Sequence, residues 1–288
     1  MSHLEALGFG AVWVGESFRR EIFANASLLL ASSNSMVVGS GIANIWARDA
    51  QAMKAGQLTL DEAYEGRFLL GLGVSHVPLV NPRGHAYDRP YSAMRAYLDA
   101  MDAAQYDAPM PAHRPLRVLA ALGPRMLELA AEKADGAHPY FVPVEHTAQA
   151  RVALGRGKLL CPEQAVVLEL DPHEARATAR HHTRTYIRLP NYRNNLERLG
   201  FGYEDFQGGG SDRLVDAVVA WGDVGRVVGR VLEQLQAGAD HVAIQVISRD
   251  LAQVPETEWA TIAAELGLGN ALERSRPQES LSDESRHP

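Results

Sequence analysis

The sequence predicts a parallel α/β fold, most simply a (β/α)8 TIM barrel that lacks its first strand. Short apolar runs alternate with helix-like segments along most of the chain, which is typical of βαβ units. The chain opens in a segment with helical character, so the strand that would precede it in a barrel is missing. An open doubly wound sheet is the alternative. The predicted strands begin near Ala11, Met36, Phe68, Leu116, Gly136, Gln164 and His241.

Helices are expected between these strands, because caps, glycines and prolines mark their ends. Gly8 ends the first helix, Asp49 caps the helix that runs to about Tyr64, and Pro124 takes the first position of its helix. The predicted helices cover residues 3–7, 24–31, 50–64, 91–104, 125–133, 145–154, 223–236 and 256–266.

Two segments interrupt the regular alternation. Residues 78–89 form a long polar loop, and loops of this length are often functional. Residues 172–221 hold several helix-like stretches, the last at 213–221, and are predicted to be an insertion between the seventh barrel strand and its helix. Residues 1–269 then form a single domain. Residues 270–288 are rich in Ser, Glu, Asp, Arg and Pro, and we expect this tail to be disordered.

Composition limits the classes of function. The 288 residues are 46% hydrophobic and 22% charged, which suits one large α/β domain. A net charge of -7 without a dense Lys/Arg block argues against a nucleic-acid partner. Cys161 is the single cysteine, so neither an internal disulfide nor a multi-cysteine zinc site is expected, and a reducing cytoplasm is the natural compartment. No signal sequence or membrane-spanning apolar run is present, and no metal site is expected.

Residues 67–76 are predicted to form a buried strand that ends at a functional site. Residues 68–72 are almost wholly apolar, which favours a strand buried on both faces. Gly71 and Gly73 permit close approach of the backbone, and Ser75 and His76 follow where the strand opens into a loop. Ligands of parallel α/β folds bind at this end of the strands. His76 is therefore a candidate site residue, although it could simply hydrogen-bond a neighbouring backbone group.

Four strand-end signatures, at residues 7–16, 39–44, 67–76 and 134–137, resemble the bacterial luciferase-like superfamily. More narrowly, they resemble its branch that uses the deazaflavin coenzyme F420, and the likeness covers residues 4–266. The resemblance implies a TIM barrel that holds the tricyclic ring at the carboxyl ends of its strands. It also implies hydride transfer between the deazaflavin and a small organic substrate, and a homodimer.

The resemblance assigns roles to individual residues. A non-prolyl cis peptide against the ring would match Gly41-Ile42, with Asn44 near the pyrimidine edge. His76 would donate or accept a proton beside the reacting carbon. Glu16 would face the ring or substrate, or alternatively orient a neighbouring group. The other implied cofactor contacts are Gly73, Val74 and Ser75 near the ring, and Leu122, Gly123, Arg125, Met126, Pro139 and Tyr140 around the phosphate.

The implied phosphate site lies at the start of the helix after Pro124. A helix N-terminus offers unpaired N–H groups and a positive dipole end. Pro124 has no N–H, so the sequence departs from the family's commoner glycine pair, and Gly123, Arg125 and Met126 would have to donate.

The substrate wall is assigned to the two irregular segments, both expected on the mouth side of the barrel. Arg83, His85 and Tyr87 lie in the long loop and Tyr192 in the insertion. These four side chains would contact the substrate or only pack a lid.

Two other functions stay open, an FMN-dependent monooxygenase and a non-catalytic flavin- or deazaflavin-binding protein. Oxygen consumption would favour the first of these. A bound cofactor that no reductant turns over would favour the second. A barrel without one strand exposes two parallel edges, so we further expect that the natural chain starts earlier or has been shortened.

Overall fold

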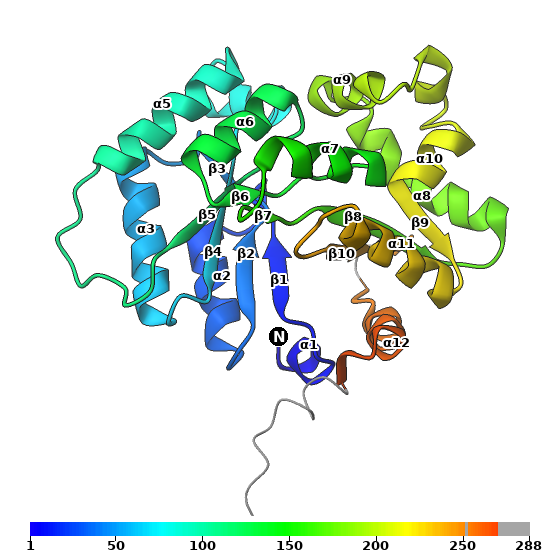
Figure 1. Ribbon diagram of the computed structural model, residues 1–288, viewed down its shortest axis with the longest axis horizontal. Coiled ribbons are helices and arrows are strands. Elements are labelled where there is room, and N and C mark those ends of the chain that lie inside the picture. Colours follow the sequence, from blue (N-terminus) through cyan, green and yellow to red (C-terminus); the bar gives the residue numbers. More distant parts are fainter. Residues whose placement is uncertain (251–252, 270–288) are drawn as a thin grey trace, which may run out of the picture.

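The computed structural model describes residues 1–250 and 253–269, so the predicted disordered tail at 270–288 lies outside the described residues. All paired strands are parallel and form a seven-stranded and a three-stranded sheet (Figure 1). The larger sheet has the order β1-β2-β4-β5-β6-β7, with β3 paired to β4, and the smaller has the order β10-β8-β9. The strands are β1 Ala11–Val14, β2 Val37–Ser40, β3 Ala43–Asn44, β4 Phe68–Gly73, β5 Leu116–Leu119, β6 Gly136–Ala137, β7 Leu159–Leu160, β8 Glu163–Leu168, β9 Val219–Gly222 and β10 Ala243–Val246.

The two sheets meet where β7 passes into β8. Cys161 and Pro162 separate these strands, and a proline has no N–H to continue the ladder. The seven predicted strands therefore follow one another around a parallel half-barrel, which confirms the α/β class. Within the described residues, β1 is an end strand of the larger sheet and β10 an end strand of the smaller sheet, each with one strand neighbour.

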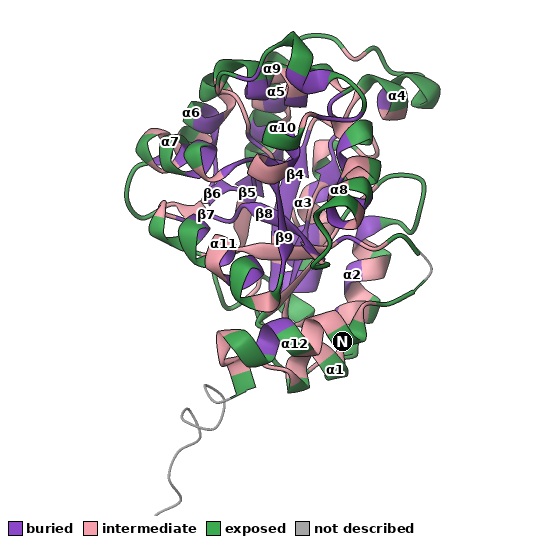
Figure 2. Ribbon diagram, turned by 90° about the vertical axis from the view of Figure 1, so that its right-hand side faces the viewer, coloured by how far each residue is buried: buried purple, intermediate pink, exposed green. Residues whose placement is uncertain are grey.

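The helices cover the outside of the strands (Figure 1). Figure 2 shows buried strands inside and helices whose outer faces are exposed. Helices α1 and α12 lie together at one end, where a Cβ on Gly8 would be 2.8 Å from the Leu268 carbonyl carbon. The helices are α1 Ser2–Ala6, α2 Ile22–Ala31, α3 Ala50–Ala63, α4 Val77–Val80, α5 Pro90–Ala103, α6 Pro124–Lys133, α7 Val144–Leu154, α8 Pro172–Tyr186, α9 Pro190–Arg198, α10 Asp212–Val218, α11 Val224–Gln236 and α12 Glu256–Leu266, with 3-10 turns η1 Asn81–Arg83 and η2 Tyr203–Phe206.

Most predicted helices occur within a few residues of their expected bounds. Asp49 caps α3, because its Oδ1 accepts a hydrogen bond from the Ala52 amide at 2.7 Å. Two expectations were wrong. The predicted loop at 78–89 begins with α4 and η1, and the helix predicted for 213–221 ends at Val218. Residues Val219–Gly222 instead form β9, because pairing with β8 satisfies their backbone groups in a buried position.

Two large apolar clusters hold the chain together. One lies between the larger sheet and the helices α2, α3, α5, α6 and α7, and it includes Leu70, Leu98 and Leu129. The other joins β8 and β9 to the helices α8, α9 and α10 through residues such as Leu196 and Trp221. The segment from α8 to α10 is therefore packed against the smaller sheet.

The contact between β2 and β4 requires a glycine. The buried Ser40 hydroxyl donates to the Gly71 carbonyl at 2.9 Å and accepts from the Gly71 amide at 2.7 Å. A Cβ on Gly71 would lie only 1.9 Å from the Ser40 carbonyl oxygen. Any side chain here has to push these two strands apart.

We expect Gly71→Ala to lower the free energy of unfolding by roughly 1–3 kcal/mol, as overpacked core positions do. Urea denaturation measures the change. The matched control is Gly229→Ala in α11, because no atom lies within 4 Å of the Cβ it would add. This control is expected to be neutral or slightly stabilising, by up to about 1 kcal/mol. Equal stability of the two variants would contradict the prediction.

Candidate functional site

A cavity of about 740 Å³ lies between β1 and β10 and reaches the loops that follow β2, β4 and β6. Its volume is that of a typical small-molecule site. Seven of the predicted site residues line it. They are Glu16, Gly41, Ile42, Ser75, His76, Tyr140 and Tyr192.

The chain makes a cis peptide bond between Gly41 and Ile42, which confirms the predicted position. This bond joins β2 to β3 at the rim of the cavity. Gly73, at the end of β4, faces it, since a Cβ on Gly73 would be 2.5 Å from Ile42 Cγ1. The Val74 carbonyl, one residue further on, accepts a hydrogen bond from the Trp46 indole at 3.0 Å. Gly73 therefore packs against Ile42, and Val74 binds Trp46. Neither residue lines the cavity.

The Glu16 carboxylate is already occupied by groups of the protein. Its Oε2 accepts from the Asn44 amide at 2.8 Å and from Arg48 Nη1 at 3.0 Å. The Glu16 and Arg48 side chains are only 5% and 11% exposed, and Arg48 also pairs with Glu21. Asn44 itself is buried, and its side-chain oxygen accepts from the Trp46 amide at 3.0 Å. Of the two roles considered for Glu16, this geometry favours orienting its neighbours.

His76 lies where β4 opens into α4, next to Ser75, whose φ of 58° is left-handed. Its ring centroid is 5.4 Å from that of Tyr192, which α9 brings to the cavity. Burial lowers the pKa of His76, and a side-chain hydrogen bond to Asn191 partly opposes this shift. The imidazole is therefore neutral at pH 7 and can accept a proton.

Three aromatic residues that the sequence interpretation overlooked also line the cavity. The ring of Trp13 stacks on His138 at 4.1 Å, and its indole N–H donates to His241 Nε2 at 3.0 Å. His138 Nδ1 donates to the Cys161 carbonyl at 2.6 Å, and burial lowers the pKa of His138 to about 4. His138 directly follows β6, so its strand-end position was a usable signal.

Tyr140, which was predicted, and three residues that were not predicted, Glu163, Tyr186 and Gln245, also line the cavity. Glu163 lies at the start of β8. The Tyr140 hydroxyl is 2.9 Å from the Tyr186 hydroxyl and 2.8 Å from Gln245 Oε1. Burial raises the pKa of Tyr140 and of Tyr186. Tyr140, Tyr186 and Gln245 therefore add an uncharged polar network to the cavity.

The residues predicted around a phosphate do not line the cavity, except for Tyr140. The Met126 amide already donates to the Gly123 carbonyl at 3.0 Å, and the Arg125 guanidinium lies over the Tyr91 ring at 4.2 Å. Leu122 and Pro139 use their carbonyls to accept from His146 Nε2 and from the Glu163 amide, respectively.

Three of the four predicted substrate residues also lie outside the cavity lining. Arg83 Nη2 is 3.5 Å from the Ser17 carbonyl oxygen, and the His85 ring lies 5.5 Å from that of Trp46. Burial raises the pKa of Tyr87. Tyr192 is the predicted substrate residue that the structure brings to the cavity.

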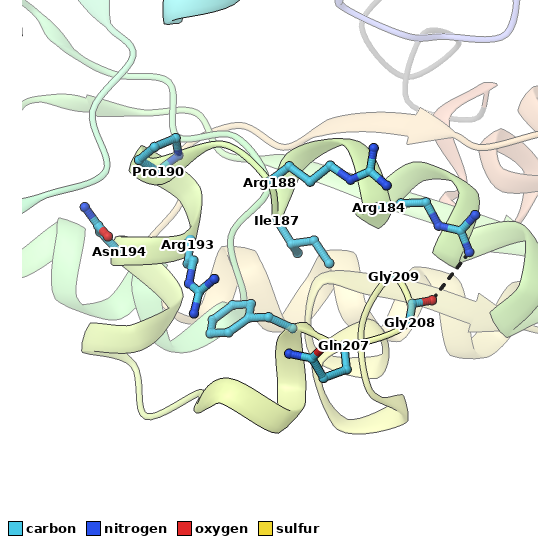
Figure 3. Close-up of a pocket in the computed structure, with 10 residues that line it drawn as sticks. Arg184, Ile187, Arg188, Pro190, Arg193, Asn194, Gln207, Gly208 and Gly209 are labelled. Carbon is cyan, nitrogen blue, oxygen red and sulfur yellow. Dashed lines mark hydrogen bonds between the residues drawn. The ribbon is translucent and has the colours of Figure 1, made fainter.

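A separate hollow of about 600 Å³ lies in the segment from α8 to η2 (Figure 3). Arg184, Arg188 and Arg193 line it, and Arg184 Nη2 is 3.4 Å from the Gly208 carbonyl oxygen. None of the predicted site residues lies there. The central cavity is therefore the better candidate for chemistry.

The described part of the chain contains no cluster of His, Cys, Asp or Glu arranged to hold a metal ion. None of its helices combines the length and apolar character needed to cross a bilayer.

Comparison with known proteins links the chain to one family. The family model described as luciferase-like monooxygenase matches residues 1–241. A 5,10-methylenetetrahydromethanopterin reductase from Methanolobus tindarius is 26% identical over 53% of this chain and 54% of its own length. A putative coenzyme F420-dependent oxidoreductase from Mycobacterium tuberculosis is 27% identical over 48% of each chain. The chain thus spans about half the length of the curated relatives it matches.

Solved structures share the fold. The coenzyme F420-dependent tetrahydromethanopterin reductase from Methanopyrus kandleri superposes with a TM-score of 0.71 at 17% identity, over 91% of this chain and 92% of its own. Solved monooxygenases, one of them in complex with FMN, have the same fold at 12–16% identity.

Proposed function

Because the chain belongs to the luciferase-like monooxygenase family, we propose that it is a coenzyme F420-dependent oxidoreductase acting on a small organic substrate. One observation carries this proposal: the stacked rings of Trp13 and His138, the backbone of Gly41 and Ile42, and a neutral His76 line the same cavity. The name of the mycobacterial relative and the F420 dependence of the reductase that shares the fold support the choice of cofactor.

The cavity residues suit a planar heterocycle. Trp13 and His138 form a flat stacked wall, and the backbone of Gly41 and Ile42 lines the space beside it. The carboxyl of Glu163 leaves one buried oxygen without a hydrogen-bond partner among the described residues, as expected where a polar ligand completes the site. Gly41, Ile42, Ser75 and Trp13 would hold the ring.

Each residue then has a defined task. The deazaflavin, when bound, supplies or accepts a hydride at its reacting carbon. His76 holds or takes up the accompanying proton on its imidazole nitrogen. Tyr192 packs against His76 and excludes water from it. Glu16 fixes the Asn44 backbone behind the cis peptide.

The same proposal includes the form of the barrel, the compartment and the oligomeric state. The fold is a TIM barrel open between β1 and β10, in the place of its first strand, and residues 172–221 are an insertion that supplies Tyr186 and Tyr192. The hydrogen bond from Trp13 to His241 bridges the opening. The protein acts in the cytoplasm as a homodimer.

An FMN-dependent monooxygenase is the second candidate. The solved monooxygenases with the same fold, including the FMN complex, favour it. Oxygen consumption separates the two, because a deazaflavin transfers hydride with little reactivity toward oxygen.

We expect oxidised F420 to quench the tryptophan fluorescence of the protein more strongly and at lower concentration than FMN or NADPH. Trp13 lines the cavity, so a ring bound there lies near it. Titration with each compound in both redox states measures this, and Trp13→Phe should remove part of the quenching, because Trp259 also lines the cavity. Tighter binding of FMN with oxygen uptake would favour the monooxygenase. F420 that binds but is turned over by no substrate or reductant would indicate a non-catalytic binding protein.

A further inference from the structure

Glu163 is a buried carboxyl at the edge of the cavity. The residue is only 4% exposed, lies at the first position of β8 and lines the cavity. Its Oε2 accepts a hydrogen bond from the Phe141 amide at 3.1 Å. Its Oε1 is buried and has no hydrogen-bond partner among the described residues. A buried oxygen without a hydrogen-bond partner lowers the stability of the folded protein, so its presence needs an explanation such as a ligand that binds it.

The surroundings keep this carboxyl neutral. Burial raises the pKa of Glu163 to about 8, although the Phe141 amide opposes the shift. The Phe141 N–H occupies Oε2, so the proton of the neutral acid belongs on Oε1. Oε1–H is then a hydrogen-bond donor inside the protein with no acceptor of its own.

The titratable groups around Glu163 add no compensating charge. Tyr140, Tyr186 and Tyr192 interact with it electrostatically, and burial raises the pKa of all three phenols. The histidines that line the same cavity, His76, His138 and His241, have pKa values lowered by burial. Glu16 is paired with Arg48, and Arg19 is the other charged residue of the lining. Within the described residues, no cation pairs with Glu163.

Phe141 holds the carboxyl in place. Its φ of 57° is unusual for a non-glycine residue, and strained backbone of this kind persists where the surroundings enforce it. The Phe141 ring packs against those of Tyr186 and Tyr192, with centroids 5.2 and 5.6 Å away. The amide that binds Oε2 is therefore anchored to the same aromatic cluster that lines the cavity.

We propose that Glu163, as a neutral acid, donates a hydrogen bond from Oε1 to a carbonyl oxygen or ring nitrogen of the heterocycle bound in the cavity. The identity of that heterocycle as F420 rests on the proposed function. Flavins and deazaflavins share these acceptors, so Glu163 serves either cofactor. Glu163 is thus a ligand-binding residue that neither the strand-end pattern nor the family resemblance indicated.

The test measures dissociation constants of oxidised F420 and of FMN for the wild-type protein, Glu163→Gln and Glu163→Ala. Loss of the hydrogen bond in Glu163→Ala should weaken binding roughly tenfold at pH 7. Glu163→Gln keeps a neutral donor and should stay within about threefold of the wild type. Between pH 7 and pH 9 the ratio of the wild-type to the Glu163→Gln constant should rise roughly tenfold, because only the wild-type side chain ionises in this range. Using this ratio cancels any ionisation of the cofactor itself.

Asp61 provides a matched control. It is also a buried carboxyl with an oxygen that lacks a hydrogen-bond partner among the described residues, and burial raises its pKa to about 7. It lies on α3, outside the cavity lining. Asp61→Asn should leave cofactor binding and its pH dependence unchanged. Infrared spectroscopy of the ligand-free protein gives a second readout: a protonated carboxyl band, absent from Glu163→Gln, should disappear as the pH rises through about 8.

The outcomes separate this inference from the proposed function. Equal affinities and pH profiles in the wild type, Glu163→Ala and Glu163→Gln would overturn the role of Glu163 while F420 dependence stands. A Glu163-dependent profile with FMN but no binding of F420 would keep the role and overturn the proposed cofactor. Binding of neither compound, or a Glu163 carboxyl already ionised at pH 6, would overturn the inference.

Discussion

Replacing His76 with alanine is expected to slow hydride transfer roughly 10²- to 10⁴-fold, the usual contribution of a general acid or base. The imidazole lines the cavity, and burial lowers its pKa, so it is neutral and available at pH 7. The measurement is the single-turnover reduction of oxidised F420 by the first alcohol or amine substrate that the wild type accepts, because in this direction the neutral imidazole takes up the proton. The cofactor dissociation constant should change less than threefold, because the ring is held by other residues.

The pH profile of the wild type provides a further check. Protonation of His76 removes the base form, so the rate of substrate oxidation should fall on the acid side, with a midpoint below the ordinary histidine value. The matched control is His173→Asn, whose side chain is 88% exposed on α8, and which should leave the rate unchanged. If His76→Ala retains the wild-type rate and profile, His76 has no part in proton transfer.

The strands were predictable because parallel strands covered on both faces keep almost continuous apolar sequences, as in Phe68–Gly73. Helix ends such as the Asp49 cap depend on a few neighbouring residues and are equally visible. β9 was missed for the opposite reason. Its residues continue an apolar run from α10, and pairing with β8, some fifty residues earlier, decides their conformation.

The site residues that directly follow a strand were predictable from the sequence. Glu16, Gly41 and His76 follow three neighbouring parallel strands, so their meeting at one cavity follows from topology. The cis bond between Gly41 and Ile42 was located by the family resemblance, because no local property of the residues requires it. Their chemical roles remain predictions.

Glu163 and His138 were not predicted, because their properties arise from tertiary packing. Glu163 precedes an apolar run, where a carboxyl would ordinarily be exposed, and in the fold it lies beside Phe141, Tyr186 and Tyr192. His138 is fixed by the Cys161 carbonyl, 23 positions away. The Met126 amide, expected to bind phosphate, is used within its own helix turn, which sequence spacing does not reveal.

Glu16→Ala is expected to lower the free energy of unfolding by roughly 3 kcal/mol, because removing one partner of a buried ion pair leaves the other uncompensated. Arg48 would keep Glu21 as a half-exposed partner, while the Asn44 amide would lose its acceptor. Urea denaturation measures the loss. The matched control is Glu132→Ala, which breaks a far more exposed pair with Arg95 and should cost much less stability.

Glu16→Gln distinguishes the two roles considered for this residue. If Glu16 orients the rim, the neutral amide still accepts from Asn44 but pairs poorly with Arg48, so stability and cofactor affinity should fall together. If Glu16 instead acts on the substrate, the rate alone should fall while stability and affinity stay at their wild-type values. We expect the first result, since both carboxylate oxygens already face Arg48. A purely kinetic defect would show that the ion pair opens when the ligand binds.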